Sequence, residues 1–101
     1  MKPIRTLSGA DQDFKETLAY YNHERDGLGY EFASEIQFAF EHISAFPHAS
    51  PVFSKRSRRY IVRRFPYGIW YEIRPDHILV LAIMHLERNP TIWIKRLRGA
   101  Q

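Results

Sequence analysis

The sequence contains no cysteine. Disulfide bonds, thiolate metal sites and cysteine nucleophiles are therefore excluded. Long apolar runs are missing as well. The longest extends from Ile78 to Met84, whereas a membrane-spanning helix needs about 18 apolar residues. Residues 1–5 have no apolar segment of the kind found in signal peptides. We therefore expect a protein that works in the cytoplasm and is not embedded in a membrane.

Recognisable catalytic and cofactor-binding motifs are also missing. Glycine-rich phosphate loops, nucleophile elbows and HExxH zinc motifs do not occur. Four of the five histidines show no spacing typical of metal ligands. They are His23, His42, His48 and His77. We expect neither a metal nor a cofactor.

What the sequence does contain is enough apolar material for one folded domain. Its 101 residues are 45% hydrophobic and 15% aromatic, and the formal net charge is +4. This predicts a single domain over residues 1–101 that needs no covalent staple. The positive charge favours anionic partners such as nucleic acid, a ribosome or an acidic protein. The alternative is that the charge has no partner, since many small soluble domains are mildly basic.

The first half of the chain has the periodicity of two helices. A short strand is expected at residues 4–7, and Ser8 is followed three residues later by an acid, a pattern that starts a helix. Apolar residues at spacings of three and four predict helices over residues 11–25 and 28–46. Gly27 is expected to end the first helix, because glycine adopts the left-handed conformation without steric cost. The two helices form a hairpin.

The second half changes to the periodicity of strands. A loop is expected over residues 48–57, then a strand from Tyr60 to Phe65. Side chains alternate in direction from Ile69 to Arg74, and the apolar run from Ile78 to Met84 predicts a central strand covered on both faces. A short helical turn is expected around Trp93. The whole predicts an α+β domain of order β-α-α-β-β-β. Its small antiparallel sheet, a short N-terminal strand plus a three-stranded meander, packs against the helical hairpin.

The densest chemical signal is a cationic segment, residues 55–64, which holds six of the fifteen basic residues. Alternate residues of a strand share a face, so Arg59 and Arg63 are expected together, beside the aromatic residues that follow. Cations interleaved with rings suit a nucleic-acid backbone with stacked bases, and an acidic protein would explain them equally well. The alternative is a solvated edge strand. The residues predicted to bind such a partner are Lys55, Arg56, Arg58, Arg59, Arg63, Tyr71 and Trp93.

His85 ends the apolar strand, and Arg88 follows three residues later. Histidine titrates near neutral pH, so His85 at the rim of a sheet could serve as a general acid or base. The alternative is a structural histidine that hydrogen-bonds a turn. Spacing alone identifies no catalytic set.

Several segments occur together in a defined order. They are Arg59, Phe65–Tyr71, Ile78–His85, Arg88–Pro90 and Trp93–Arg96, preceded upstream by Ala19–Tyr21, Gly27–Gly29, Phe32 and Phe46–Pro47. This ordered combination resembles the RelE/ParE superfamily of small bacterial toxins (the plasmid stabilisation family). The resemblance covers nearly the whole chain, although no single tetrapeptide in it is diagnostic.

The resemblance implies a fold and two possible activities. The fold is an antiparallel sheet with the helical hairpin packed on one side. Ribosome-dependent members cleave mRNA with lysines, arginines and a C-terminal tyrosine or histidine, whereas ParE-like members lack that set and poison DNA gyrase. In both groups an antitoxin neutralises the toxin by wrapping a C-terminal segment around it.

Two positions favour the ParE-like group. The mRNA-cleaving members commonly carry an arginine directly after the tyrosine of the middle strand, and this chain has Gly68 after Tyr67. The C-terminal aromatic position is held by Trp93, which has no ionisable proton. We therefore expect the growth-arresting toxin of a type II toxin–antitoxin module that binds DNA gyrase rather than catalysing a reaction. A cognate antitoxin is expected to cover the cationic face around Arg59 and Arg63.

The alternative is a ribosome-dependent endoribonuclease, whose partners are the ribosome and mRNA. In that case Arg59, Arg63 and Arg88 would neutralise charge on the phosphate, and His85 would exchange a proton with the attacking or leaving oxygen. A third possibility is a plain nucleic-acid-binding module or a relative that has lost its toxicity.

Overall fold

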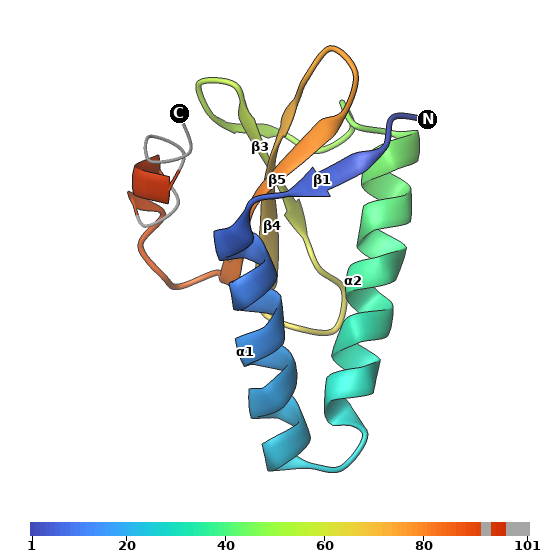
Figure 1. Ribbon diagram of the computed structural model, residues 1–101, viewed down its shortest axis with the longest axis vertical. Helices are drawn as coiled ribbons and strands as arrows, with labels where there is room; N and C mark the ends of the chain where they lie inside the picture. Colours follow the sequence, from blue (N-terminus) through green and yellow to red (C-terminus); the bar gives the residue numbers. More distant parts are fainter. Residues whose placement is uncertain (92–93, 97–101) are drawn as a thin grey trace.

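A computed structural model describes residues 1–91 and 94–96 of the chain. A helical hairpin packs against a mixed sheet, as Figure 1 shows. The elements are β1 (Ile4–Thr6), α1 (Ser8–Glu24), α2 (Leu28–Ala45), β2 (Val52–Ser54), β3 (Ser57–Ile61), β4 (Tyr67–Ile73) and β5 (Ile78–His85). Within the described residues, the sheet has five strands in the order β1-β5-β4-β3-β2. The predicted α+β class is confirmed, and the observed order differs from the predicted one by an additional strand, β2.

Helix α1 begins earlier than the sequence pattern predicts. It starts at Ser8 rather than at residue 11, so Ser8 is the first helical residue and not its cap. The residue in the capping position is Leu7, which makes no side-chain capping hydrogen bond. The helix ends where the N–H of Arg25 donates to the carbonyl of Tyr21. Gly27 does adopt a left-handed conformation (φ 86°), but it precedes α2 rather than ending α1.

The predicted three-stranded antiparallel meander is confirmed as β3, β4 and β5, and the rest of the sheet differs from the prediction in two respects. First, β1 runs parallel to β5, with Ile4 opposite Ile78. The all-antiparallel prediction was wrong because the hydrophobic pattern of a short edge strand does not encode its direction. Second, the predicted loop at residues 48–57 contains β2, which pairs antiparallel with β3. A three-residue strand has too little alternation to be recognised in a segment rich in proline and serine.

Strand β3 is displaced toward the N-terminus of its predicted position. It spans Ser57–Ile61, whereas a strand was expected from Tyr60 to Phe65. The turn into β4 begins at Val62, whose N–H donates to the carbonyl of Tyr67 at 2.9 Å. Arg64 within this turn has a φ of 68°, a left-handed conformation that no strand residue adopts. Alternation of side chains therefore stops before Arg63.

The core has two parts, one on each face of the sheet. The larger part lies between the sheet and the helices, where Phe32, Ile69 and Tyr71 are completely buried. The smaller part lies on the face opposite the helices, hereafter the far face, and consists of Trp70, Leu81, Ala82 and Met84. The predicted coverage of β5 on both faces is confirmed. Leu81 is an extra residue in this strand, because Val80 pairs with Tyr71 and Ala82 with Trp70.

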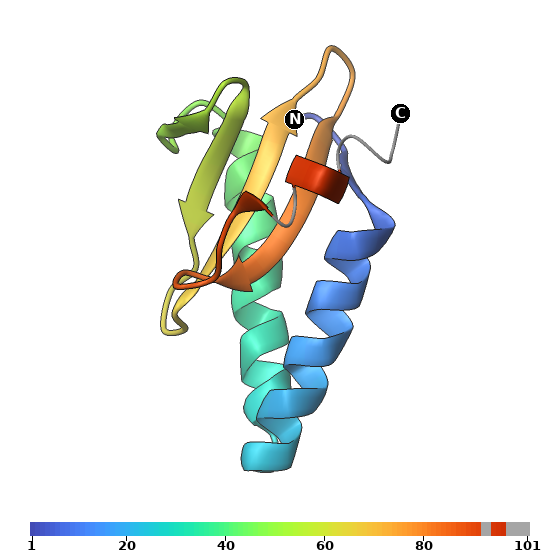
Figure 2. The same cartoon turned by 90° about the vertical axis from the view of Figure 1, so that its left-hand side faces the viewer.

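The C-terminal part of the chain returns to the far face of the sheet. Figure 2 shows this turn, in red, in front of the sheet, with α2 behind the sheet and α1 to its right. Ile94 packs against the cluster that contains Trp70. The predicted helical turn around Trp93 cannot be compared, since Trp93 lies outside the described residues. No helix in the described ranges has the length and apolar character of a membrane span.

Candidate functional site

The tip of the β2–β3 hairpin presents two of the predicted cations to solvent. Lys55 and Arg56 form the turn between the strands, and both are exposed. Lys55 has a φ of 50°, and the hydroxyl of Ser57 donates to the carbonyl of Ser54 at 2.7 Å, which closes the turn. The tip is therefore built by backbone geometry rather than by its charges. Lys55 and Arg56 lie where an anionic partner can reach them.

Two other predicted binding residues are engaged inside the protein. The guanidinium of Arg58 donates to the carbonyl of Ser50 at 2.7 Å. Its partner across the sheet, Tyr71, is completely buried and donates its hydroxyl to the carbonyl of Pro47 at 2.7 Å. Burial raises the pKa of the Tyr71 hydroxyl above its ordinary value. Both side chains hold the segment after α2 against the sheet.

Arg59 points to the far face of the sheet. Its guanidinium lies 5.2 Å from the centroid of the Phe53 ring, a cation–π contact. Phe53 in turn meets the ring of Trp70, which is opposite Arg59 in the β3–β4 register. Arg59 is thus the cationic end of an aromatic row on the far face. Trp93, the remaining predicted binding residue, lies outside the described part of the chain.

Arg63 and Arg64 turn to the other side and pack on α2. The Arg63 guanidinium lies 4.6 Å from the centroid of the Phe38 ring, and its Nε is 4.0 Å from a carboxylate oxygen of Glu35. Arg64 pairs with Glu31 at 2.7 Å and with Glu35 at 3.4 Å. The guanidinium of Arg64 holds the pKa of the Glu31 carboxyl below its usual value. These arginines fasten the β3–β4 turn to the helix.

The expectation that Arg59 and Arg63 share a face is therefore wrong. Strand β3 ends at Ile61, and the left-handed residue Arg64 reverses the chain, so the alternation of an extended strand does not reach Arg63. The two cations lie on opposite sides of the sheet. They do not form one cationic surface.

His85 and Arg88 belong to a turn at the end of β5. The Nδ1 of His85 accepts a hydrogen bond from the N–H of Glu87 at 3.1 Å, and its ring meets the ring of Tyr67 with centroids 5.5 Å apart. The N–H of Arg88 donates to the carbonyl of His85 at 3.0 Å, and the residue is exposed. Tyr67 packs against the helix-side core, so His85 lies on the face away from Arg59. The sheet therefore separates Arg59 from Arg63 and His85.

Gly68 is enclosed by side chains of the far face. A Cβ at this position would lie 3.1 Å from ring atoms of Trp70 and 3.2 Å from a methyl group of Leu86. A side chain at this position would therefore require Trp70 or Leu86 to shift slightly. The glycine therefore leaves room for the packing of Trp70, and the position offers no cation to a phosphate.

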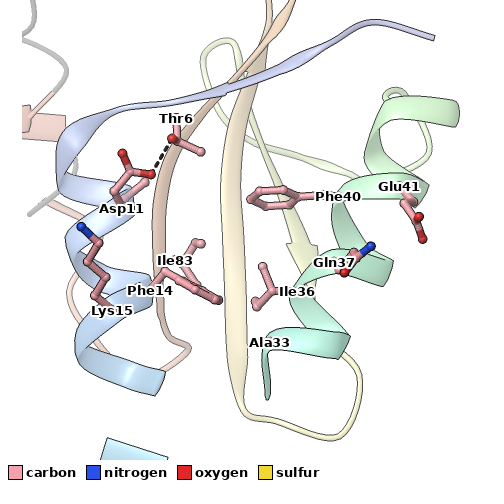
Figure 3. A pocket seen from close by; sticks show the side chains of 11 residues that line it. Thr6, Asp11, Phe14, Lys15, Ala33, Ile36, Gln37, Phe40, Glu41 and Ile83 are labelled. Atoms are coloured by element: carbon pink, nitrogen blue, oxygen red, sulfur yellow. Dashed lines mark hydrogen bonds between the residues drawn. The ribbon is translucent and has the colours of Figure 1, made fainter. Parts of the chain in front are cut away.

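The structure also has a groove that the sequence pattern did not reveal. Figure 1 shows α1 and α2 close together at the hairpin end and apart at their other ends. The groove lies between them, above Ile83 of β5, and encloses a cavity of about 600 Å³ (Figure 3). Its lining is mostly apolar, with charged and amide groups at the rim. The lining residues are Thr6, Ala10, Asp11, Phe14, Lys15, Ala33, Ile36, Gln37, Phe40, Glu41 and Ile83.

Sequence reasoning missed this groove because apolar helix stripes were taken entirely as core. Phe14 and Phe40 carry the helical spacing of core residues, yet both remain only partly buried. Their rings line the two walls of the groove, as Figure 3 shows. Incomplete burial follows from the divergence of the helices, which no local pattern encodes.

Charge is divided unequally along the chain. Residues 1–46, which include β1 and both helices, carry eight acidic and four basic side chains, a net charge of −4. Residues 47–101 carry three acidic and eleven basic side chains, a net charge of +8. The acidic part of the chain thus contains β1 and both helices, and the basic part contains strands β2 to β5. Within the described residues, no three histidine or acidic side chains are grouped to hold a metal ion.

Comparisons with known proteins agree with this fold. A family model described as "ParE toxin of type II toxin-antitoxin system, parDE" matches residues 4–90. A solved structure described as "Chromosomal ParDE TA system from P. aeruginosa" superposes with a TM-score of 0.75 at 16% sequence identity, covering 86% of this chain and 98% of that one. Among curated proteins, no match was found. Because the family model spans nearly the whole chain, this protein belongs to the ParE toxin family of type II toxin–antitoxin systems.

Proposed function

We propose that this protein arrests bacterial growth in the cytoplasm by binding and inhibiting DNA gyrase, and that a cognate antitoxin neutralises it. Membership of the ParE family supports a toxin of this type. The observation that carries the choice of gyrase over mRNA is the separation of Arg59 from the other candidate catalytic residues. Arg59 and Arg63 lie on opposite sides of the sheet, and His85 is engaged in a turn. Cleavage of a phosphodiester needs its cations and its acid or base around one phosphate.

Gly68 supports the same conclusion from the packing. A side chain after Tyr67 would bring its Cβ into tight contact with Trp70 and Leu86, which would have to shift. The middle strand has a glycine where mRNA-cleaving relatives commonly carry a cation. Inhibition by binding needs no acid or base, and it is compatible with cations that are distributed over separate surfaces.

The groove and the hairpin tip are the two surfaces on which we place the antitoxin. The groove is apolar and open, so it suits the apolar face of a helical segment. The hairpin tip, with Lys55 and Arg56, suits an acidic segment, whose approach the positive charge would accelerate. A partner that wraps around the protein would occupy both.

The target is tested in bacteria a few minutes after the protein is induced without an antitoxin. The 5′ ends of a well-translated mRNA are mapped by primer extension, and the superhelicity of a reporter plasmid is measured in the same cells. We expect intact mRNA and a relaxed or cleaved plasmid. Cuts at codon-spaced positions would overturn the proposal and indicate that the ribosome assembles Arg59, Arg63 and His85 into a site. Unimpaired growth with both nucleic acids intact would mean that the protein has the fold of the family but is not toxic.

The antitoxin surface is tested with two arginine substitutions one residue apart on α2. Ala33 lines the groove, whereas Ser34 beside it is exposed. Ala33→Arg should weaken the complex with the co-expressed antitoxin by about tenfold or more, because the long side chain fills the cavity. Ser34→Arg adds the same charge outside the groove and should leave the affinity unchanged. Equal affinities for both variants would remove the groove from the antitoxin interface.

A further inference from the structure

A buried carboxylate in α1 connects three separate parts of the chain. Asp13 is only 7% exposed. Its Oδ2 accepts a hydrogen bond from the backbone N–H of Ile83 at 3.1 Å and another from Arg96 at 2.6 Å. Its Oδ1 accepts from the second terminal nitrogen of Arg96 at 2.8 Å. This paired, planar arrangement is the strongest geometry available to a guanidinium and a carboxylate. Asp13 thus joins helix α1 both to strand β5 and to the C-terminal turn.

The hydrogen bond from Ile83 to Asp13 replaces one that no neighbouring strand supplies on this side of β5. Strand β1 accompanies β5 only as far as Val80, where the N–H of Leu7 donates to the Val80 carbonyl at 3.0 Å. Beyond that point β5 has lost its parallel neighbour, and the N–H of Ile83 would have no strand partner on that side. A buried N–H without a partner is costly. The carboxylate of Asp13 supplies the acceptor that β1 does not.

Gly9 makes the path of Arg96 possible. A Cβ on Gly9 would lie 2.6 Å from both Cδ and Nε of Arg96. The arginine side chain crosses α1 directly over this residue to reach Asp13, one turn further along the helix. Any other residue at position 9 would push the guanidinium away. Glycine within a helix is normally unfavourable, and this close contact explains why position 9 is a glycine.

The C-terminal turn is held at a second point. Ile94 packs against the apolar cluster of the far face, beside Trp70, Leu81 and Met84. Figure 2 shows the turn lying across that face. The C-terminal turn is therefore held by an apolar contact at Ile94 and by an ion pair with α1 at Arg96.

We propose that Gly9, Asp13 and Arg96 form a latch that straps the C-terminal turn over the far face and fixes α1 as a wall of the groove. The link to the groove is Ile83, whose side chain lines it while its backbone N–H is bound by Asp13. Ala10 and Phe14 flank the latch on α1 and also line the groove. In this scheme Arg96 is a positioning residue. An effect of the latch on antitoxin binding would rest on the proposed function, because it requires the antitoxin to occupy the groove, whereas the latch itself does not depend on it.

The latch is tested on the isolated, full-length protein by hydrogen–deuterium exchange. Arg96→Ala leaves the buried carboxylate without its cation, so Asp13 should turn toward water and release Ile83. We expect exchange at Ile83 and over residues 10–15 to accelerate by about tenfold or more, with unchanged exchange in β4. Lys95→Ala, which alters the exposed neighbour of Arg96, is the matched control and should change neither. Equal acceleration in β4 would indicate general destabilisation and overturn the proposal, as would unchanged exchange at Ile83.

Gly9→Ala separates the latch from stability. Alanine favours the helix intrinsically, which offsets part of the loss, so the variant should be destabilised less than Arg96→Ala. Its Cβ should nevertheless displace Arg96 and accelerate exchange at Ile83, as in Arg96→Ala. A protein that keeps slow exchange at Ile83 in Gly9→Ala would show that Arg96 is not latched over α1. Neither experiment needs an antitoxin or a toxicity assay, so failure here is distinguishable from failure of the proposed function.

Discussion

Replacement of Asp13 by alanine should destabilise the protein far more than replacement of a neighbouring acid. The variant leaves the buried N–H of Ile83 without an acceptor, which costs about 1–3 kcal/mol. The lost pair with Arg96 adds less, about 0–1 kcal/mol, because the Arg96 side chain is 25% exposed and can turn to water. Together these terms give about 1–4 kcal/mol. For a domain of this size the middle of that range corresponds to a melting temperature lower by about 10–20 °C.

Urea denaturation followed by circular dichroism measures this difference, and two further variants resolve its origin. Asp13→Asn keeps one acceptor oxygen and should cost about 1 kcal/mol less than Asp13→Ala. Asp11→Ala removes an exposed acid whose hydrogen bond is with the Thr6 hydroxyl, so it should cost less than about 0.5 kcal/mol. The reasoning is refuted if Asp13→Ala is no more destabilising than Asp11→Ala.

Further predictions concern Tyr71 and the cationic hairpin. Tyr71→Phe removes the hydrogen bond to the Pro47 carbonyl and should cost about 1–2 kcal/mol in the same denaturation assay, with the β3–β4 register retained. Because burial raises the pKa of the Tyr71 hydroxyl above 10.0, its contribution is complete below pH 10 and should be lost as the pH rises toward the folded pKa. A pH titration of stability should therefore show a shallower alkaline decline in Tyr71→Phe; an identical decline would contradict this assignment. Arg56→Glu with Arg59→Glu should slow antitoxin association by about tenfold at low salt and much less at high salt, whereas Arg5→Glu on β1 should not. Surface plasmon resonance at two ionic strengths measures the association rate. Equal rates for the double variant and for Arg5→Glu would exclude the hairpin from the antitoxin interface.

Periodic patterns allowed much of the fold to be predicted. Apolar spacing identified both helices, and the continuous apolar run identified β5 as a strand covered on both faces. The direction of β1 could not be predicted, because pairing with β5 depends on tertiary contacts and not on alternation. The predicted position of β3 was wrong for a related reason. Its end is set by a left-handed residue, Arg64, whose ion pairs with α2 lie far away in sequence.

The candidate site was less predictable than the fold. Composition identified the cations, but only the turn after β3 decides that Arg63 packs on Phe38 while Arg59 meets Phe53. The groove arises from the divergence of two helices whose stripes look like ordinary core. The bond between Asp13 and Arg96 joins residues at opposite ends of the chain. A single acid in an amphipathic helix carries no signal that it will be buried.

The most direct test of the central claim is a supercoiling assay with purified DNA gyrase, relaxed plasmid and the purified protein. The account predicts that supercoiling is inhibited, that the inhibition survives Arg63→Ala and His85→Ala, and that the cognate antitoxin reverses it. Full gyrase activity at a large excess of folded protein would contradict the account. If the same protein then cleaved mRNA in a translating extract and lost this activity in His85→Ala, the ribonuclease alternative would replace it.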